Sequence, residues 1–389
     1  MNKNKLIFLP LLLLTVLSFI FSKPKISFAY ENKMYLSKAY CLMDANSGTI
    51  IISGNETEHL PIASMCKIMT LNLCFDEIEN NRLSMDDTVI ISQNASGMGG
   101  SQVYLEQNGQ YKVFELIKSI VVASANDSCI AMAEHIYGSE ELFVQKMNEK
   151  AKLLNMNDTN FVNATGLPKP GQYSCAKDCA IMFKELLSHK DYFKFSTIWM
   201  DKIEHQKGRI TEISNTNKLI RFYNGCDAGK TGYTSEAGHC LSASAIKNGM
   251  RLIAVVIKSP DSKTRFKEVS DIFNYGFANF MTKTIIDNEK PLNFTAEIEN
   301  GKKECVELIA ENSFSYLCKK DEKTNFEIDF ELNKNLSAPI NKFDQVGKIN
   351  IYKDGTKLTS INILANENIS KKSYVDYLED IIKNWKISV

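Results

Sequence analysis

The chain lacks a surplus of charge of either sign. Its 389 residues include 46 Lys and Arg against 46 Asp and Glu. A nucleic-acid-binding protein normally carries a basic excess, so this balance argues against a polyanionic partner. The five histidines lack the spacing of metal ligands, and the ten cysteines include no C-x-x-C pair. We therefore expect neither a nucleic-acid partner nor a bound metal.

A second long hydrophobic run is also missing. The first, at 6–21, follows Lys3 and Lys5 and precedes the small-residue segment Ser27-Phe28-Ala29. A basic start, about 16 apolar residues and an A-x-A-like end are typical of a cleavable signal peptide, and the run is short for a bilayer span of about 20 residues. We predict a signal peptide over 1–29 and an exported remainder, although an uncleaved anchor stays open. Without the four lysines of 1–29, the mature chain would carry 42 basic and 46 acidic side chains.

Ten cysteines in an exported chain would ordinarily indicate disulfides. Most of them stand within apolar or motif segments, where a small buried residue is expected: Cys66, Cys74, Cys129, Cys175, Cys179, Cys226 and Cys240. Cys305 and Cys318 flank a possible strand-turn-strand and could pair. The sequence leaves that question open.

Hydrophobic patterning divides the rest of the chain into three regions. Residues 30–288 begin and end with strand-like segments and have helical periodicity between them, which predicts an antiparallel sheet packed by helices, an α+β domain. Residues 289–368 alternate in short segments broken by Asn, Asp and Gly, so a small all-β domain is expected. Residues 369–389 return to helical periodicity. The strand-like segments of the first region are 39–43, 49–52, 240–245 and 251–257, and its helical segments include 113–121, 140–154 and 263–280.

A Ser-x-x-Lys motif, Ser64-Met65-Cys66-Lys67, starts one predicted helix. Positions i and i+3 share a helix face, so the Lys67 amine can lie beside the Ser64 hydroxyl. A serine becomes a good nucleophile when a neighbouring base takes its proton, and a lysine is such a base when desolvation keeps it neutral. Taken alone, the motif is more typical of a helix-capping serine and a solvated lysine.

Two further motifs follow at separations of 60 and 106 residues. Ser124-Ala125-Asn126 could relay a proton and hold an amide, but Ser and Asn also favour turns between helices. Lys230-Thr231-Gly232 offers a fixed cation, a hydroxyl and a glycine that allows close approach to the backbone, although a tight loop before a strand would look the same. Together and in this order, the three motifs are the signature of penicillin-recognising serine enzymes.

The surrounding sequence makes the resemblance more specific. The stretch 61–70, PIASMCKIMT, resembles the D-alanyl-D-alanine carboxypeptidase family, and the likeness extends over about residues 35–285. This resemblance implies the penicillin-recognising serine transferase fold, with an antiparallel sheet covered by helices on both sides and a helical subdomain. It also implies removal of the terminal D-alanine from peptidoglycan stem peptides, covalent inhibition by β-lactam antibiotics, and no cofactor. Whether the substrate is vegetative wall or spore cortex stays open.

The family resemblance assigns a role to each candidate residue. Ser64 would be the acyl-forming nucleophile and Lys67 the group that accepts its proton. Ser124 would act as a third catalytic residue in the proton relay. Backbone N–H groups of Ser64 and Tyr233 would bind the oxyanion, and Arg265 would lie near the pocket for the substrate carboxylate. The substrate-binding positions implied are Asn126, Lys230, Thr231, Gly232, Tyr233, Thr234 and Arg265.

Three positions depart from the family pattern. Cys66 replaces a threonine, Gln172 replaces a histidine, and Ala228 interrupts an Asp-Gly pair. None of them removes a catalytic group. Because position i+2 lies on the opposite face of the helix from Ser64, we predict that Cys66 is a small core residue.

Two alternative functions remain to be weighed. A serine β-lactamase shares the three motifs, but its class A form needs a glutamate between the second and third motifs, and the segment 158–163 has only Asp158. A non-catalytic wall-binding or antibiotic-sensing domain is disfavoured because Ser64, Lys67 and Lys230 are intact.

The C-terminal segment predicts an amphipathic helix. Its apolar residues follow one helical stripe, and charged residues fill the rest. A helix of this kind can lie in a membrane interface without spanning it, so we expect a peripheral contact with the outer face of the cytoplasmic membrane; a helix docked on the β domain is the alternative. The stripe is formed by Tyr374, Tyr377, Leu378, Ile381, Ile382 and Trp385.

Overall fold

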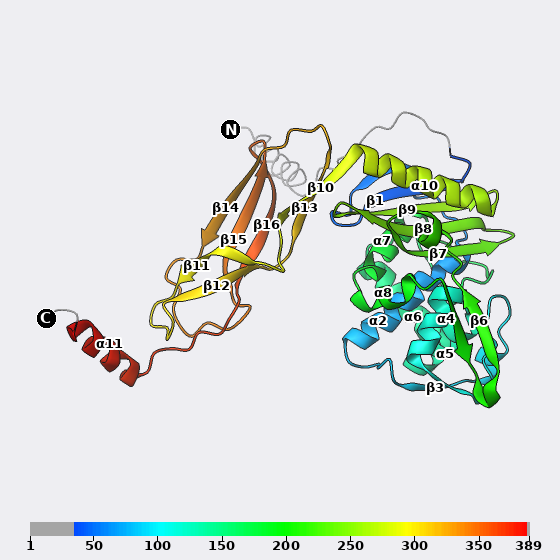
Figure 1. Ribbon diagram of the computed structural model, residues 1–389, viewed down its shortest axis with the longest axis horizontal. Helices are drawn as coiled ribbons and strands as arrows, with labels where there is room; N and C mark the ends of the chain where they lie inside the picture. The colour runs from blue at the N-terminus through cyan, green and yellow to red at the C-terminus, as the bar shows by residue number, and fades with distance from the viewer. Residues whose placement is uncertain (1–34, 387–389) are drawn as a thin grey trace, which may run out of the picture.

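The computed structural model describes residues 35–386 (Figure 1). A five-stranded antiparallel sheet in the order β2-β1-β9-β8-β7 organises the larger part of the molecule. Strands from both ends of this region meet at its centre, where Ala39 of β1 pairs with Ile257 of β9. The bounds are β1 Ala39–Asp44, β2 Ile50–Gly54, β7 Cys226–Thr234, β8 Gly238–Lys247 and β9 Met250–Ser259.

The sheet separates two hydrophobic cores because alternate side chains of a strand point to opposite faces. In β9, Ile253 and Val255 join the core on the side of the helical region, whereas Ala254 and Val256 join the core beneath α10, Ser262–Asn279. Figure 1 shows α10 lying along one face of the sheet and the helical region on the other side. With both faces covered, β9 reads as a nearly continuous apolar run.

The helical region contains five main helices. Local signals explain several of their ends: the Ser139 hydroxyl accepts a hydrogen bond from the Leu142 N–H at the start of α6, where Glu140 complements the helix dipole. The main helices are α2 Lys67–Glu79, α4 Val113–Ala123, α5 Asn126–Tyr137, α6 Glu140–Leu153 and α7 Ala176–Leu186.

Shorter elements connect these helices. Two small hairpins pair β3 with β4 and β5 with β6. The bounds are η2 Ala63–Cys66, β3 Thr88–Ile90, α3 Gln93–Ser96, β4 Gln110–Lys112, η3 Lys190–Tyr192, α8 Phe193–Ser196, β5 Met200–Glu204, η4 Gln206–Gly208, β6 Ile210–Ser214 and α9 Leu219–Phe222.

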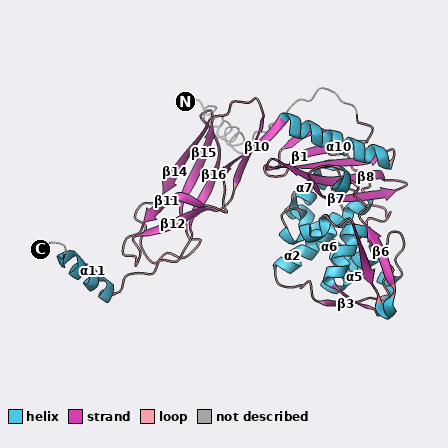
Figure 2. Ribbon diagram, in the orientation of Figure 1, coloured by secondary structure: helices cyan, strands magenta, loops and turns pink. Residues whose placement is uncertain are grey.

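The following region is built from strands (Figure 2). A second five-stranded sheet has the order β11-β12-β16-β15-β14, and β10 pairs with β13. The strands are β10 Phe280–Ile286, β11 Pro291–Glu297, β12 Cys305–Ala310, β13 Phe314–Lys319, β14 Phe326–Leu332, β15 Gln345–Lys353 and β16 Thr356–Ala365. The α+β architecture and the all-β region are therefore confirmed, while the exact domain boundaries stay predictions.

The cysteine question is answered by the same strands. Cys305 is exposed on β12, Cys318 is buried on β13, and both are free thiols. The other eight cysteines are free and buried. The possible disulfide between Cys305 and Cys318 does not form. The buried positions of the others confirm that most cysteines serve as small core residues.

The last helix, α11 Tyr374–Lys386, lies apart from the sheets in Figure 1. It contacts the β region near its own start, where the Tyr377 hydroxyl donates to Asn300 Oδ1 at 2.8 Å and Lys302 pairs with Asp376 at 3.3 Å. Over residues 35–386, no helix is long and apolar enough to cross a membrane. The predicted signal peptide, 1–29, and the side chain of Trp385 lie outside what the structure describes.

Candidate active site

Ser64 and Lys67 meet at the start of the helix that the sequence predicted. Ser64 lies in the 3-10 turn η2, which leads directly into α2. The Lys67 Nζ is 2.9 Å from the Ser64 Oγ and donates to the Thr165 carbonyl oxygen at 2.6 Å. Lys67 is fully buried. The expected pairing of hydroxyl and amine on one face is confirmed.

The Thr165 carbonyl belongs to a loop that packs against the η2 turn. At Gly166, φ is +81°, and a Cβ would lie 2.0 Å from the Ala63 carbonyl oxygen. Glycine is needed here for both reasons, backbone conformation and space. Sequence reasoning missed Thr165 as a partner of Lys67, because a backbone carbonyl leaves no side-chain signature.

Ser124 occupies an unusual backbone conformation at the end of α4. Its φ and ψ are 62° and 34°, in the left-handed region, which costs a non-glycine residue about 1 kcal/mol or more. This turn directs the Ser124 Oγ toward Lys230, whose Nζ donates to it at 2.7 Å. Strained residues of this kind are concentrated at functional sites.

Asn126 begins α5 and is held from two sides. Its N–H donates to the Ser101 carbonyl and its Nδ2 to the Gly99 carbonyl, both at 2.7 Å. Its Oδ1 is buried and has no hydrogen-bond partner among the described residues. An amide fixed in this way presents one acceptor, which suits an incoming N–H donor.

Strand β7 carries the third motif along the edge of the sheet. Lys230 is 1% exposed and Thr231 is 7% exposed. At Gly232, a Cβ would lie 2.6 Å from the Ile62 carbonyl oxygen and 3.2 Å from the Ser64 nitrogen. The glycine therefore lets β7 approach the η2 turn closely. The three motifs converge on one site, as the sequence predicted.

The two buried lysines shape the electrostatics of this site. Burial lowers the pKa of Lys67, and burial together with repulsion from Lys67 lowers the pKa of Lys230 well below its ordinary value. Neither lysine has a carboxylate hydrogen-bond partner within residues 35–386. The site therefore disfavours a proton on both amines at once. A neutral lysine can accept a proton from a neighbouring hydroxyl.

Tyr233 and Thr234 form the end of β7, and the buried Arg265 of α10 contacts the strand beside them. Arg265 on α10 donates to the carbonyl oxygens of Gly232 and Cys240, each at 3.2 Å, and burial lowers its pKa to about 10. Tyr233 is 59% exposed. The Thr234 hydroxyl accepts from the Ala237 N–H at 3.0 Å. Arg265 thus connects α10 to β7 and β8.

A cavity of about 280 Å³ opens beside the η2 turn. Its walls include Ala63, Gly166, Gln172 and Thr234. Gln172, one of the departures from the family pattern, shapes this wall because its Oε1 accepts from the N–H groups of Val162 and Asn163. The substitution therefore leaves the loop beside the cavity hydrogen-bonded.

Cys66, the second departure, points into the protein interior. It is fully buried, and its thiol donates to the Asn163 carbonyl oxygen at 3.3 Å. Burial raises the pKa of this thiol. The prediction that Cys66 is a core residue is confirmed. Ala228, the third departure, is buried and accepts a hydrogen bond from Asn217 Nδ2.

Comparison with known proteins agrees with this geometry. Residues 27–261 match the peptidase S11 model, D-alanyl-D-alanine carboxypeptidase, and residues 280–371 match the C-terminal domain of penicillin-binding protein 5. The chain is 38% identical to the D-alanyl-D-alanine carboxypeptidase DacF of Bacillus subtilis, over 90% of each chain.

Solved structures show the same likeness. Penicillin-binding protein 5 of Haemophilus influenzae superposes with a TM-score of 0.69 at 30% identity, covering 88% of this chain and all of that one. Penicillin-binding protein D2 of Listeria monocytogenes, solved with ampicillin bound, has a TM-score of 0.57 at 28% identity and covers 64% of this chain and all of its own. With its converging motifs, its fold and these relatives, the chain belongs to the D-alanyl-D-alanine carboxypeptidase family.

Proposed function

We propose that this protein is a serine D-alanyl-D-alanine carboxypeptidase that uses Ser64 as its nucleophile. The observation that carries the proposal is the 2.9 Å approach of the Lys67 amine to the Ser64 hydroxyl in a site that already holds a second buried lysine. A desolvated, neutral amine at this distance is positioned to act as a base.

Acylation follows from this arrangement. Lys67 takes the Ser64 proton, and the Ser64 oxygen attacks the carbonyl carbon between the last two D-alanines. The C–N bond breaks, and the departing amine of the terminal D-alanine receives the proton that Lys67 took, relayed through the hydroxyl of Ser124, which Lys230 holds by a hydrogen bond. The product is an ester of Ser64. A water molecule then gives a proton to the neutral Lys67 and attacks the ester carbonyl. The C–O bond to Ser64 breaks, and the Ser64 oxygen takes the proton back from Lys67, which restores the enzyme.

The remaining motif residues position the substrate in this proposal. Lys230, Thr231 and Thr234 would bind the terminal carboxylate. The Oδ1 of Asn126, which has no hydrogen-bond partner among the described residues, would accept a substrate N–H. The backbone N–H groups of Ser64 and Tyr233 would stabilise the oxyanion. Arg265 would support this carboxylate pocket through β7, since its guanidinium donates to the carbonyl of Gly232.

A β-lactam antibiotic would acylate the same serine. Its ring carbonyl would meet the same nucleophile, and the ester would persist wherever no group activates water against it. The Ser64 and Lys67 hydrogen bonds within the described chain include no carboxylate, in contrast with the glutamate that class A β-lactamases use. The observation favours a penicillin-binding carboxypeptidase over a β-lactamase.

Export and membrane contact complete the proposal. The N-terminal segment would direct the chain across the cytoplasmic membrane, where peptidoglycan is matured. The apolar side chains of α11 support a peripheral contact with the membrane surface, because several of them are exposed in the described chain: Tyr374, Val375, Leu378, Ile381 and Ile382.

Two measurements test the enzyme. The purified protein should release D-alanine from a synthetic pentapeptide ending in D-Ala-D-Ala, and intact-mass analysis after penicillin treatment should show one adduct. Ser64→Ala should abolish both results. Ser235→Ala, at an exposed serine that directly follows β7, should preserve both. An adduct that survives Ser64→Ala would refute the assignment.

The membrane contact is tested separately. The full chain should sediment with anionic phospholipid vesicles, and the double variant Ile381→Asp, Ile382→Asp should lose this binding while keeping its penicillin adduct. Glu379→Ala, on the charged side of the same helix, should still bind. Unchanged binding by the double variant would exclude α11 as the contact.

A further inference from the structure

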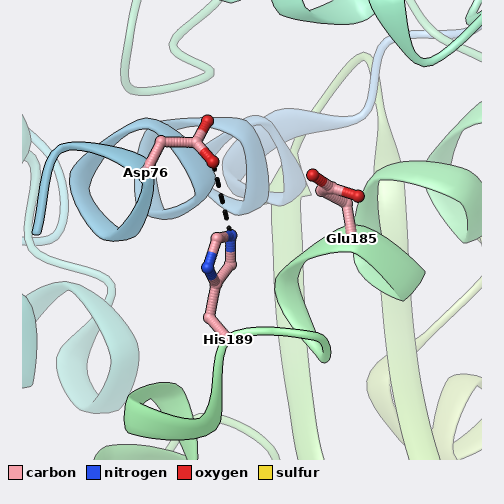
Figure 3. A group of neighbouring side chains, drawn as sticks. All are labelled: Asp76, Glu185 and His189. Carbon is pink, nitrogen blue, oxygen red and sulfur yellow. Dashed lines mark ion pairs between the residues drawn. The ribbon is translucent and has the colours of Figure 1, made fainter. Parts of the chain in front are cut away.

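A second polar cluster lies away from the active site, between three helical elements. Asp76 is on α2, Glu185 is on α7, and His189 immediately precedes η3. Each residue offers one ligand atom, and these atoms lie within 4.8 Å of one another. Figure 3 shows the two carboxylates on neighbouring helices and the imidazole directed at Asp76.

His189 is the least expected member of this cluster. Its side chain is 3% exposed, and its Nε2 is buried without a hydrogen-bond partner among the described residues. Nε2 faces Asp76 Oδ1 at 3.8 Å, too far for a hydrogen bond. A buried ring nitrogen facing carboxylate oxygen is costly unless a cation or a proton lies between them.

The other ring nitrogen is already held. Nδ1 lies 2.8 Å from Glu79 Oε1, and the ring stacks on Phe75 with centroids 5.6 Å apart. A carboxylate at Nδ1 fixes the proton on that nitrogen and leaves the Nε2 lone pair facing the cluster. Metal-binding histidines are commonly oriented by a carboxylate in this way.

The Lys150 side chain neutralises the two carboxylates of this cluster. The Lys150 Nζ of α6 lies 3.0 Å from Asp76 Oδ2 and 2.6 Å from Glu185 Oε1. Lys150 therefore satisfies the oxygens and leaves the imidazole Nε2 unsatisfied. Its side chain is 16% exposed, so its flexible stem has access to solvent.

We propose that Asp76, Glu185 and His189 form a binding site for a divalent first-row transition-metal ion, with Lys150 as its internal competitor. Two ligands that each lie about 2.1 Å from a metal are at most about 4.2 Å apart, so the 3.8 Å separation of Nε2 and Oδ1 suits a shared ion. One imidazole and two carboxylates favour Zn²⁺, Co²⁺ or Mn²⁺. Solvent supplies the remaining ligands.

Lys150 joins the two carboxylates by charged hydrogen bonds, and a bound ion would join them and His189 as well. Asp76 is near the end of α2, the helix that begins with Lys67, and Glu185 is at the end of α7. A metal would fix both helix ends to the turn at His189. Its effect is therefore expected on stability, with no direct part in the reaction.

Co²⁺ is the most discriminating probe, because its spectrum reports the ligand type. The purified protein should bind one Co²⁺ with visible d–d bands and without a near-ultraviolet thiolate charge-transfer band, and Zn²⁺ should displace it. His189→Gln should abolish the spectrum. Glu79→Gln should weaken binding by about 10-fold to 100-fold, as loss of an orienting partner usually does.

Two variants distinguish this site from a folding defect and from binding at a thiol. Lys150→Gln should bind Co²⁺ more tightly than the natural protein, a gain that misfolding does not produce. A second group, Asp158, Cys175 and Asp178, also lies within ligand distance. Because it includes a thiol, Cys175→Ser should leave the proposed spectrum unchanged.

Where a Co²⁺ signal is seen, three results would overturn the proposal. These are a thiolate band that Cys175→Ser removes, binding that persists in His189→Gln, and equal or weaker binding in Lys150→Gln. Absence of any Co²⁺ signal at millimolar concentration in both the natural protein and Lys150→Gln would also overturn it, and would identify the cluster as an ion-pair network alone.

Discussion

The molecule places fully or largely buried lysines in two contrasting surroundings. In the active site, Lys67 and Lys230 contact hydroxyls and carbonyls, and burial lowers the pKa of each. At the junction of α2, α6 and α7, Lys150 contacts two carboxylates, and these hydrogen bonds outweigh desolvation and raise its pKa. The contrast teaches that the partner decides whether a buried lysine becomes reactive or stabilising.

The largest difference between the two surroundings is expected in the acylation rate when each lysine is replaced by methionine, which is similar in length and uncharged. Lys67→Met should slow acylation by penicillin by about 10²-fold to 10⁴-fold, the usual loss when a general base is removed. Lys150→Met should leave this rate within about threefold, because it lies outside the proposed chemistry. Stopped-flow measurement with a fluorescent penicillin gives both rates. Equal loss in the two variants would contradict the comparison.

The pH dependence of acylation should come from the active-site pair alone. Because the folded-state pKa of Lys67 is lowered, this amine is neutral over more of the pH range, and protonation removes the base as pH falls. The rate should therefore decrease between about pH 9 and pH 5, by about tenfold per unit once the pKa is passed. A flat profile in the natural protein would argue against Lys67 as the base. Lys150→Met should show the natural profile.

Stability should respond in the opposite order. Lys150→Met leaves Asp76 and Glu185 close together without their cation, and because these groups are partly exposed we expect a loss of about 2 kcal/mol in the free energy of unfolding. Lys67→Met should cost about 1 kcal/mol or less, because relief of desolvation offsets the lost hydrogen bond to Thr165. Urea unfolding of both variants measures the difference. A larger loss at Lys67 would reverse the interpretation.

The smallest effect concerns a third buried ionisable group, the Cys66 thiol beside Lys67. Its raised pKa and full burial predict almost no reaction with iodoacetamide at neutral pH, and no loss of activity. The exposed Cys305 thiol should react first and serves as the internal control. Rapid modification of Cys66 that penicillin prevents would show that this thiol faces the site.

Side chains that carry chemistry at fixed spacing could be predicted from the sequence, and their convergence could be expected. Ser64, Lys67, Ser124 and Lys230 are examples, because each motif needs particular residue types. The pairing of β1 with β9 could not be predicted in the same way, since the register between strands about 200 residues apart in the sequence depends on packing. Backbone partners such as the Thr165 carbonyl leave no motif at all.

The cluster at Asp76 and His189 shows a different limit. Sequence reasoning looked for metal ligands at short, regular spacing and expected no metal, whereas the structure assembles its candidates from α2, α7 and the turn before η3. Their proximity follows from helix packing. The open question of Cys305 and Cys318 was settled in the same way, by the placement of β12 and β13.

The left-handed backbone of Ser124 has a consequence for engineering this protein. Glycine adopts that conformation without steric cost, so Ser124→Gly relieves the backbone strain at this position, although it also gives the unfolded chain more conformational freedom. The same replacement would remove the hydroxyl that contacts Lys230. Under the proposed function, selection for heat resistance alone would give this proton-relay serine no protection, so each round of a directed-evolution campaign needs an antibiotic-labelling screen to retain it.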